Sequence, residues 1–281
     1  MNCYFVSDLH GKVDRYHKLF ELIVKNPPDL LFFGGDLLPH RLRQVENYED
    51  FAIDFLFPSL RELKAALQER YPQIFVILGN DDPRSEEQKF IDESSTSLFF
   101  YANQRAWAEN GILVFGYSFV PPTPFQLKDW EKYDVSRYVD PGCVPPDEGF
   151  RTADPDYDTG YDTIQLDIEN LTNGHDLFSA ILMFHSPPYQ SLLDRAGLDG
   201  HIIDHVPLDV HVGSIAIQKF IAEKQPLITL HGHIHESTRL TGSWKEKTGN
   251  TWSFNAAHDG PELSVVQFDT RNPEKAIRVL Y

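Results

Sequence analysis

Seven polar side chains follow apolar runs in this sequence, and all seven are of types that bind metal ions. They are Asp8, His10, Asp36, Asn80, His185, His233 and His235. A short run of consecutive apolar residues is typical of a buried β-strand. In open α/β sheets, ligands bind beyond the carboxyl ends of the strands. We therefore expect these side chains to gather at one edge of a sheet.

The types of donor predict two borderline divalent cations. Imidazole and carboxylate ligands without thiolates suit Mn, Fe, Zn, Co or Ni. Seven donors exceed what one catalytic ion needs, so we expect two ions, roughly 3.5–4 Å apart, that share a bridging carboxylate. The pairs Asp8/His10 and His233/His235 are each two residues apart. In an extended chain such residues point the same way, so each pair would face one ion.

The elements that position these residues alternate between strands and helices. Apolar runs at 2–6, 30–33 and 74–78 predict three strands joined by helices, and hence a buried, mainly parallel sheet. Further strands are expected at 112–115, 178–184 and 227–230, with a helix at 214–223. The tail predicts closing strands of a second sheet at 253–255, 263–268 and 276–280.

The region from Val120 to Thr163 differs from the rest of the chain in composition and in hydrophobic periodicity. It is rich in Pro, Asp, Tyr and Gly and has no sustained periodicity. Long irregular segments inside compact domains are usually functional or disordered, and its aromatic residues favour packing. We predict a flap beside the active site. Because no internal repeat or low-complexity linker is present, residues 1–281 are predicted to form a single domain.

Charge and cysteine content narrow the classes of function. The formal net charge is −17, which disfavours broad binding to nucleic acids or anionic membranes. A carboxylate cluster becomes electropositive once it holds cations, so an anionic substrate stays compatible with this charge. Only Cys3 and Cys143 are present, which predicts no disulfide framework and favours a reducing cytoplasm. No apolar run is long enough to span a bilayer.

Five blocks of residues resemble those of the calcineurin-like metallophosphoesterases in order and spacing. The blocks are Asp8-Leu9-His10, Gly35-Asp36, Gly79-Asn80-Asp81-Asp82, His185 and Gly232-His233-Ile234-His235. A lone Asp-x-His is common in unrelated proteins, whereas five blocks in order, each at a strand end, are specific. The resemblance implies an α/β fold, a four-layer αββα sandwich with mixed sheets and the site at the C-terminal ends of strands.

The resemblance also implies a role for each donor. Six of them would bind one ion each, in the groups Asp8, His10, His235 for the first ion and Asn80, His185, His233 for the second. Asp36 would bridge the two ions. A hydroxide shared by the ions would attack phosphorus in line, while the metals neutralise the developing charge. The implied activity is hydrolysis of a small phosphoester, either a diester or a monoester.

One position departs from the family pattern. Many members carry His after the third-block Asn, where it contacts the substrate, and here that residue is Asp81. A carboxylate is a poor acid near neutral pH unless its surroundings raise its pKa, so Asp81 is a candidate catalytic acid, a further cation ligand or a part of the pocket wall. His40 and His258 are two further catalytic candidates, with an ordinary loop histidine as the competing interpretation.

Two other functions compete with a metal-dependent phosphoesterase. A non-catalytic scaffold with the same fold would be expected to lack some of the seven donors, and all of them are present here. A protein Ser/Thr phosphatase is disfavoured because Asp81 replaces the usual His and few basic residues flank the blocks. The physiological substrate and the oligomeric state are not predicted.

Overall fold

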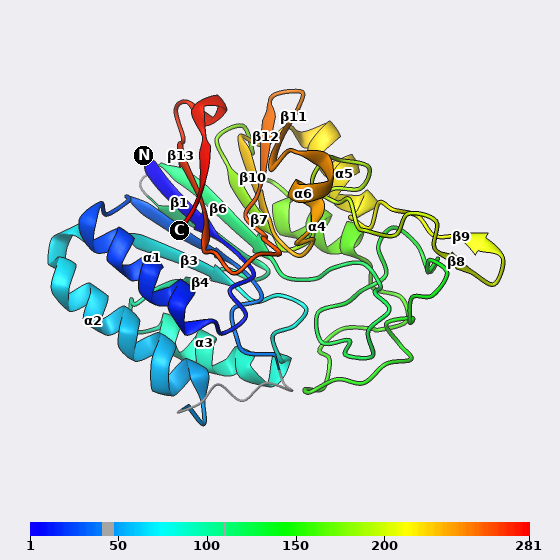
Figure 1. The fold of residues 1–281 in the computed structure, drawn as a ribbon, viewed down its shortest axis with the longest axis horizontal. Coiled ribbons are helices and arrows are strands. Elements are labelled where there is room, and N and C mark those ends of the chain that lie inside the picture. Colours follow the sequence, from blue (N-terminus) through cyan, green and yellow to red (C-terminus); the bar gives the residue numbers. More distant parts are fainter. Residues whose placement is uncertain (41–47, 110) are drawn as a thin grey trace.

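The computed structural model describes residues 1–40, 48–109 and 111–281, and two six-stranded β-sheets dominate it (Figure 1). The first sheet contains, in spatial order, β14 (Ile277–Leu280), β13 (Ser264–Asp269), β1 (Asn2–Val6), β2 (Leu30–Gly34), β3 (Gln73–Ile77) and β4 (Phe100–Tyr101). The second contains β11 (Lys245–Thr248), β12 (Thr251–Asn255), β10 (Ile228–His231), β7 (Ile181–Phe184), β6 (Ile112–Tyr117) and β5 (Arg105–Glu109). A separate hairpin pairs β8 (Ile202–Ile203) with β9 (Val206–Pro207).

Both sheets are mixed, with parallel strands at the centre. In the first sheet β1 to β4 run parallel, and β13 and β14 are antiparallel additions at one edge. In the second, β12, β10, β7 and β6 run parallel, and the outer strands β11 and β5 are antiparallel. The parallel centres bring several strand C-termini to the same side of the molecule, where the predicted donors lie.

The helices cover the outer faces of the two sheets. They are α1 (Val13–Lys25), α2 (Phe57–Leu67), α3 (Glu87–Ser94), α4 (Ile164–Thr172), α5 (Ile215–Lys224) and α6 (Ser237–Thr241). Helices α1, α2 and α3 lie on the first sheet, whereas α4 and α5 lie on the second (Figure 1). A π-helical turn (Ala52–Leu56) precedes α2, and 3-10 turns occur at Gln68–Arg70, Arg84–Glu86 and Pro273–Lys275.

Strand alternation divides the apolar core into two parts. Cys3 and Phe5 of β1 pack between the sheets, in one buried cluster with Met183 of β7. Tyr4 and Val6 point the other way and pack with the helices in a second cluster. Side chains of adjacent residues in a strand face opposite sides, so a strand covered on both faces must be apolar throughout. The predicted four-layer αββα sandwich with mixed sheets is confirmed.

The prediction for the C-terminal tail was wrong in one respect. Strand β12 belongs to the second sheet, as expected, but β13 and β14 belong to the first. Asn2 and Phe5 of β1 pair with Asp269 and Val266 of β13, and β14 then pairs with β13. An alternating apolar pattern identifies a half-buried strand but carries no information about which neighbour it pairs with.

Residues 120–163 contain no helix or strand, yet part of this segment is deeply buried. The run 128–134 is buried at every position, whereas Tyr138 and Tyr161 are about 70% exposed. Isolated bridges, such as those from Val120 to Glu131 and from Tyr133 to Thr163, replace regular pairing. The segment is therefore anchored in its first half, and a flap role for it stays a prediction.

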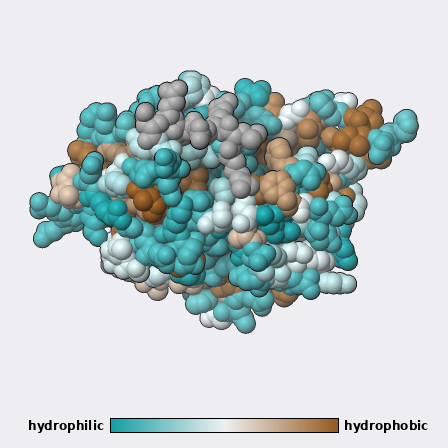
Figure 2. All heavy atoms as spheres, turned by 90° about the horizontal axis from the view of Figure 1, so that it is seen from below, coloured by the Kyte–Doolittle hydropathy of each residue, from teal (hydrophilic) through white to brown (hydrophobic). Residues whose placement is uncertain are grey.

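The surface seen in Figure 2 is mostly hydrophilic, with scattered apolar side chains. One apolar group lies at the end of the molecule from which the β8–β9 hairpin projects, where Ile202, Ile203 and Val206 are exposed. In the part of the chain that the structure describes, no helix combines the length and apolar character needed to cross a membrane.

Candidate metal centre

Five strand ends carry the seven predicted donors. Strands β1, β2 and β3 of the first sheet lead into the loops with Asp8, His10, Asp36 and Asn80, while β7 and β10 of the second lead into those with His185, His233 and His235. The donors therefore come from both sheets and meet where the C-terminal ends of the strands face each other (Figure 1).

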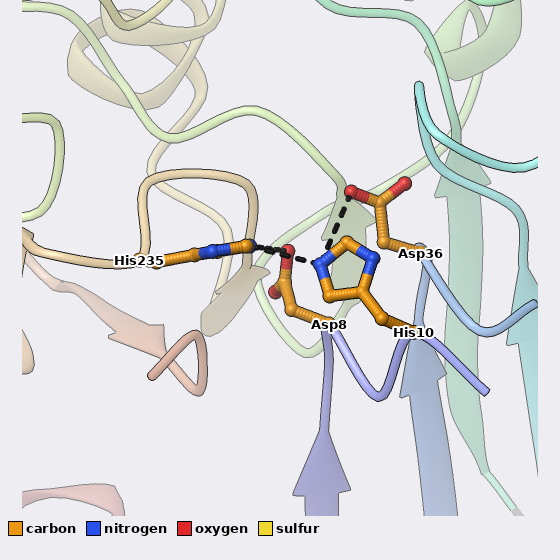
Figure 3. Close-up of side chains that lie close together, drawn as sticks. All are labelled: Asp8, His10, Asp36 and His235. Carbon is orange, nitrogen blue, oxygen red and sulfur yellow. Dashed lines mark hydrogen bonds and ion pairs between the residues drawn. The ribbon is translucent and has the colours of Figure 1, made fainter. Parts of the chain in front are cut away.

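Four of the donors form one tight group. Asp8, His10, Asp36 and His235 each offer a ligand atom, and these atoms all lie within 4.8 Å of one another (Figure 3). His235 Nε2 is 3.0 Å from Asp8 Oδ1 and 3.1 Å from His10 Nε2. Atoms with lone pairs that converge in this way repel one another unless a proton or a cation lies between them. This group is a candidate metal-binding cluster.

The three remaining donors, His185, Asn80 and His233, form a second group beside Asp36. His185 Nε2 is 3.1 Å from Asn80 Oδ1 and 3.3 Å from Asp36 Oδ2. The ring of His233 lies 5.3 Å from that of His185, centroid to centroid, and its backbone N–H donates to the carboxylate of Asp8. His185 Nδ1 lies 2.8 Å from the carbonyl of Gly34. Donation from Nδ1 to that carbonyl leaves Nε2 free to bind an ion.

The backbone at the site is not extended, so the geometric reason given for the paired residues was wrong. Asp8, His10, Asp36 and His233 have φ of 58°, 48°, 52° and 69°, in the left-handed region. For residues other than glycine this conformation costs of the order of 1–3 kcal/mol each, and such residues cluster at functional sites. The turns, and not strand alternation, direct these side chains toward a common point.

Two glycines permit the close approach of the loops. A Cβ on Gly35, whose φ is +96°, would lie 2.6 Å from His185 Nδ1 and 2.9 Å from the backbone nitrogen of Gly79. A Cβ on Gly79 would collide with Asp36 and would lie 2.6 Å from His185 Cε1. Any side chain at either position would push the donor loops apart. This is the physical reason for the Gly-Asp and Gly-Asn pairs noted in the sequence.

The buried carboxylates of the site stabilise positive charge, as the pKa shifts of Asp8 and His185 indicate. Burial opposes ionisation of Asp8, but the hydrogen bond from His235 and nearby imidazoles hold the pKa of this carboxyl well below its usual range. Burial would lower the pKa of His185, yet the carboxylate of Asp36 raises that pKa to about 10. Burial and the adjacent His185 lower the pKa of His233 to about 3. In the metal-free site, the proton on His185 supplies positive charge beside Asp36. A bound divalent cation would supply that positive charge instead.

Asp82 links two of the donor loops. Its buried carboxylate accepts N–H bonds from Leu37 and Leu38, beside Asp36, and from Gly79, beside Asn80, at 3.1, 2.7 and 2.9 Å. The carboxylate thus fixes the two loops relative to each other. Asp82 is the last residue of the third of the five blocks found in the sequence.

Two other supporting residues were missed in the sequence. Arg15 on α1 is buried, and its Nη1 donates to the carbonyl of Asp8 at 2.7 Å. The indole N–H of Trp130 donates to the carbonyl of Asp82 at 2.8 Å. Arg15 lies little more than one helical turn after His10 in the sequence, and this spacing alone only weakly indicates a role at the site. Trp130 lies in the irregular segment, where no periodicity marks it.

Asp81 lies at the edge of the cluster and not inside it. Its backbone N–H donates to Asp36 Oδ1 at 2.8 Å, and its Oδ2 lies 3.7 Å from His10 Nδ1. The side chain is 27% exposed, so it can reach a bound molecule. Partial burial and the carboxylate of Asp36 raise the pKa of Asp81 to about 7. In the metal-free protein this carboxyl therefore keeps its proton up to near neutral pH.

Within the part of the chain that the structure describes, no hydrogen bond or ion pair joins His40, His258 or His231 to the seven donors. His40 is exposed, and within the described residues no contact joins it to the donors. His258 Nε2 lies 2.9 Å from Glu262. His231 is fully buried between Ser186 and Thr229, in agreement with a structural role. A catalytic role for His40 or His258 stays a prediction.

Comparisons with known proteins bear on both the sequence and the fold. A family model described as calcineurin-like phosphoesterase matches residues 1–237. A protein of Invertebrate iridescent virus 3 named as a phosphoesterase (078R) is 30% identical over 107 residues, which make up 35% of this chain. The match spans only 28% of that viral protein.

Two solved structures resemble the whole fold. TT1561 of Thermus thermophilus superposes with a TM-score of 0.56 and 15% identity, over 99% of this chain and 98% of its own. A dimetal phosphatase from Danio rerio superposes with a TM-score of 0.50 and 10% identity, over 100% of this chain and 99% of its own. At such low identities these similarities establish a common fold and nothing more.

Proposed function

The chain belongs to the calcineurin-like phosphoesterase family, as its five residue blocks predicted, and on this premise we propose that it is a phosphoesterase that uses two divalent cations. The observation that carries the proposal is the position of Asp36. Its Oδ2 lies 4.0 Å from His10 Nε2 of the first group of donors and 3.3 Å from His185 Nε2 of the second group. A carboxylate between two groups of donors suits a ligand that both ions share.

The proposed ligands divide between the two ions. Six donors bind one ion each, in the groups Asp8, His10, His235 for the first and Asn80, His185, His233 for the second, and Asp36 is shared. Nitrogen and oxygen donors without sulfur suit Mn, Fe, Zn, Co or Ni. Ions of this kind, when bound, hold phosphoryl oxygens, neutralise developing charge and lower the pKa of water enough to supply a nucleophile.

The residues of the chain then perform distinct tasks around the phosphoryl group. Asp8 and Asp36 provide buried negative charge, and Gly34 orients the ring of His185 through its carbonyl. Asp81 is the proposed proton donor to the leaving oxygen, because its exposed edge faces the cluster. Cations bound at Asp36 would lower the pKa of Asp81. Proton donation by Asp81 should matter most for esters whose leaving group is a strong base, because such a group leaves slowly unless it is protonated.

We propose a small phosphoester as substrate, with a diester favoured over a monoester. A monoester carries more negative charge near neutral pH, and the carboxyl of Asp81 stands beside the proposed binding position. The protonated carboxyl offers no positive charge to offset the negative charge of a monoester, so a diester, with less negative charge, is the better match. The Danio rerio structure that shares this fold is named as a dimetal phosphatase, which is compatible with the proposed chemistry.

The decisive experiment combines metal analysis with hydrolysis assays. Metal-free protein should take up two Mn²⁺ per chain and then hydrolyse bis(p-nitrophenyl) phosphate or p-nitrophenyl phosphate. Asp36→Asn and His233→Ala should abolish hydrolysis. Full activity in either variant would sink the assignment, and a wild-type chain that takes up no metal would favour the scaffold. Asp92→Asn, on the exposed side of α3, is a matched carboxyl-to-amide control.

A second experiment isolates Asp81. Asp81→Asn removes the ionisable proton and keeps the size of the side chain. We expect a larger loss of kcat with an alkyl ester than with a p-nitrophenyl ester, because p-nitrophenolate leaves without protonation. Equal losses with both esters would assign Asp81 to binding or to the pocket wall.

A further inference from the structure

We propose that residues 129–134, here called the bridging segment, position the ligands of the second ion from both sheets at once. The inference rests on the proposed function, since it assigns Asn80 and His185 to that ion. Asn80 follows β3 in the first sheet and His185 follows β7 in the second, so no single element fixes the distance between them. The bridging segment contacts the loops of both.

One end of the bridging segment is bonded to the loop that carries Asn80. The indole N–H of Trp130 donates to the carbonyl of Asp82 at 2.8 Å, and the carboxylate of Asp129 accepts the backbone N–H of Arg84 at the same distance. The guanidinium of Arg84 also lies over the ring of Trp130, 5.4 Å from its centroid. Trp130 and Asp129 are fully buried, so these bonds are shielded from water.

The other end is bonded to the elements beside His185. The carboxylate of Asp134 accepts the hydroxyl of Ser214 and the backbone N–H of Ile215, both at 2.6 Å, at the start of α5. Ser214 in turn donates its N–H to the carbonyl of Pro187, two residues after His185, at 2.9 Å. A buried carboxylate at a helix N-terminus is a strong cap, so this attachment should resist local opening.

Between these ends the bridging segment has little freedom to stretch. Its backbone bonds to Val120 twice, since Val120 donates to the carbonyl of Trp130 and Lys132 donates to that of Val120. The carboxylate of Glu131 accepts the ammonium of Lys128 at 2.5 Å in a fully buried pair. Only three residues separate Trp130 from Asp134. The segment therefore acts as a short tie of fixed length between the two donor loops.

The donors of the first ion have a different outer support, the buried Arg15, which donates to the carbonyls of Asp8 and Gly260. Within the described residues, no hydrogen bond joins the bridging segment to Asp8, His10 or His235. The positions of those donors depend on the loops after β1 and β10 and on bonds such as that from His235 to Asp8. Loosening the bridging segment should therefore weaken the second ion selectively. General destabilisation of the fold would weaken both ions.

Two variants loosen the tie at opposite ends. Trp130→Phe removes the indole N–H and keeps an aromatic ring, and Asp134→Asn removes one of the acceptor oxygens that cap α5. Trp107→Phe is a matched control, because its indole N–H donates to the carbonyl of Tyr101 at 3.3 Å, outside the site. Asp50→Asn is the matched control for loss of a carboxylate acceptor at a helical N-terminus, since Asp50 accepts the backbone N–H of Ile53 at 3.1 Å.

Calorimetric titration of each metal-free protein with Mn²⁺ measures the two affinities separately. In Trp130→Phe and Asp134→Asn we expect one of the two binding steps, that of the second ion, to lose about 10–100-fold in affinity, the usual effect of removing an outer support of a ligand. The affinity of the other step, and both affinities in the two controls, should stay within about threefold of wild type.

The possible failures can be told apart. A wild-type chain that takes up two ions, with both variants unchanged or with both steps weakened equally, would overturn this inference alone. A wild-type chain that takes up one ion or none would overturn the proposed function, and this inference with it. A selective loss in either variant supports the inference even if the other variant does not fold.

Discussion

The two proposed groups of donors differ in what holds them together. Asp8, His10 and His235 converge through strained turns and direct contacts, with His235 bonded to Asp8 and adjacent to His10. Asn80 and His185 also come from different sheets and meet directly, and the bridging segment in addition bonds to the loops beside both of them. The contacts among Asp8, His10 and His235 act within the cluster. The contacts of the bridging segment can pass a movement of residues 129–134 on to Asn80 and His185. We infer that the first ion is bound as a property of its own loops and the second as a property of the whole fold.

Substitution of Asp36, the carboxylate that both ions are proposed to share, gives the strongest test of the difference between the two groups of donors. Asp36→Asn should remove the distinction, because both ions lose the same ligand. We expect activity to fall by more than about 100-fold, since losing even an outer support of a ligand costs 10–100-fold. The measurement is kcat/KM with bis(p-nitrophenyl) phosphate, together with the number of ions bound. A variant that keeps one ion at wild-type affinity would show that Asp36 belongs to one group only.

Asp82 tests the outer support without touching a ligand. Its carboxylate accepts N–H bonds from Leu37, Leu38 and Gly79, and an asparagine amide has one acceptor oxygen for these donors. Asp82→Asn should destabilise the fold by about 1–3 kcal/mol for each buried donor left unpaired. It should also lower activity by about 10–100-fold. Denaturant unfolding and steady-state kinetics separate the two effects, and a stability loss without any kinetic loss would contradict the positioning role.

The sequence was sufficient to predict the elements that carry the donors. Uninterrupted apolar runs identify strands buried on both faces, and the predicted donors are the polar residues that follow β1, β2, β3, β7 and β10. Pairing was less predictable, because β13 joins β1 from the far end of the chain. Periodicity is a local property and pairing partners are not, which explains why β13 and β14 were assigned to the wrong sheet.

The supports of the site were harder to predict than its donors. The donors can be recognised in the sequence because each of them follows an apolar run that predicts a strand. The bonds from Trp130 to Asp82 and from Asp134 to Ser214 join residues 48 and 80 positions apart, with no pattern around them. The left-handed turns at Asp8 and His10 were likewise not anticipated. Such contacts depend on tertiary packing, which propensity and periodicity do not contain.

The pH dependence of metal binding should sharpen the contrast between the two groups. In the metal-free protein the pKa of His185 is about 10, so this ring carries an extra proton below that pH. The second ion must displace the proton, and its affinity should rise about tenfold per pH unit below pH 10. His233, with a pKa of about 3, is already neutral and releases no proton near neutral pH.

Titration at pH 6, 7 and 8 in buffers of different ionisation enthalpy gives both the slope and the number of protons released. A slope of zero for both binding steps would exclude His185 as a ligand of either ion. His185→Gln, which cannot be protonated in this range, should remove the slope and weaken the binding.

The smallest effect is expected at His258, which the sequence proposed as a catalytic candidate. Its Nε2 lies 2.9 Å from Glu262, a half-exposed carboxylate, and Asp259 lies 3.8 Å from its other ring nitrogen. Ion pairs with exposed partners contribute little to stability, because water screens them. His258→Ala should keep kcat/KM within about twofold of wild type and the melting temperature within about 2 °C. A tenfold loss of kcat at an unchanged melting temperature would instead place His258 in the reaction itself.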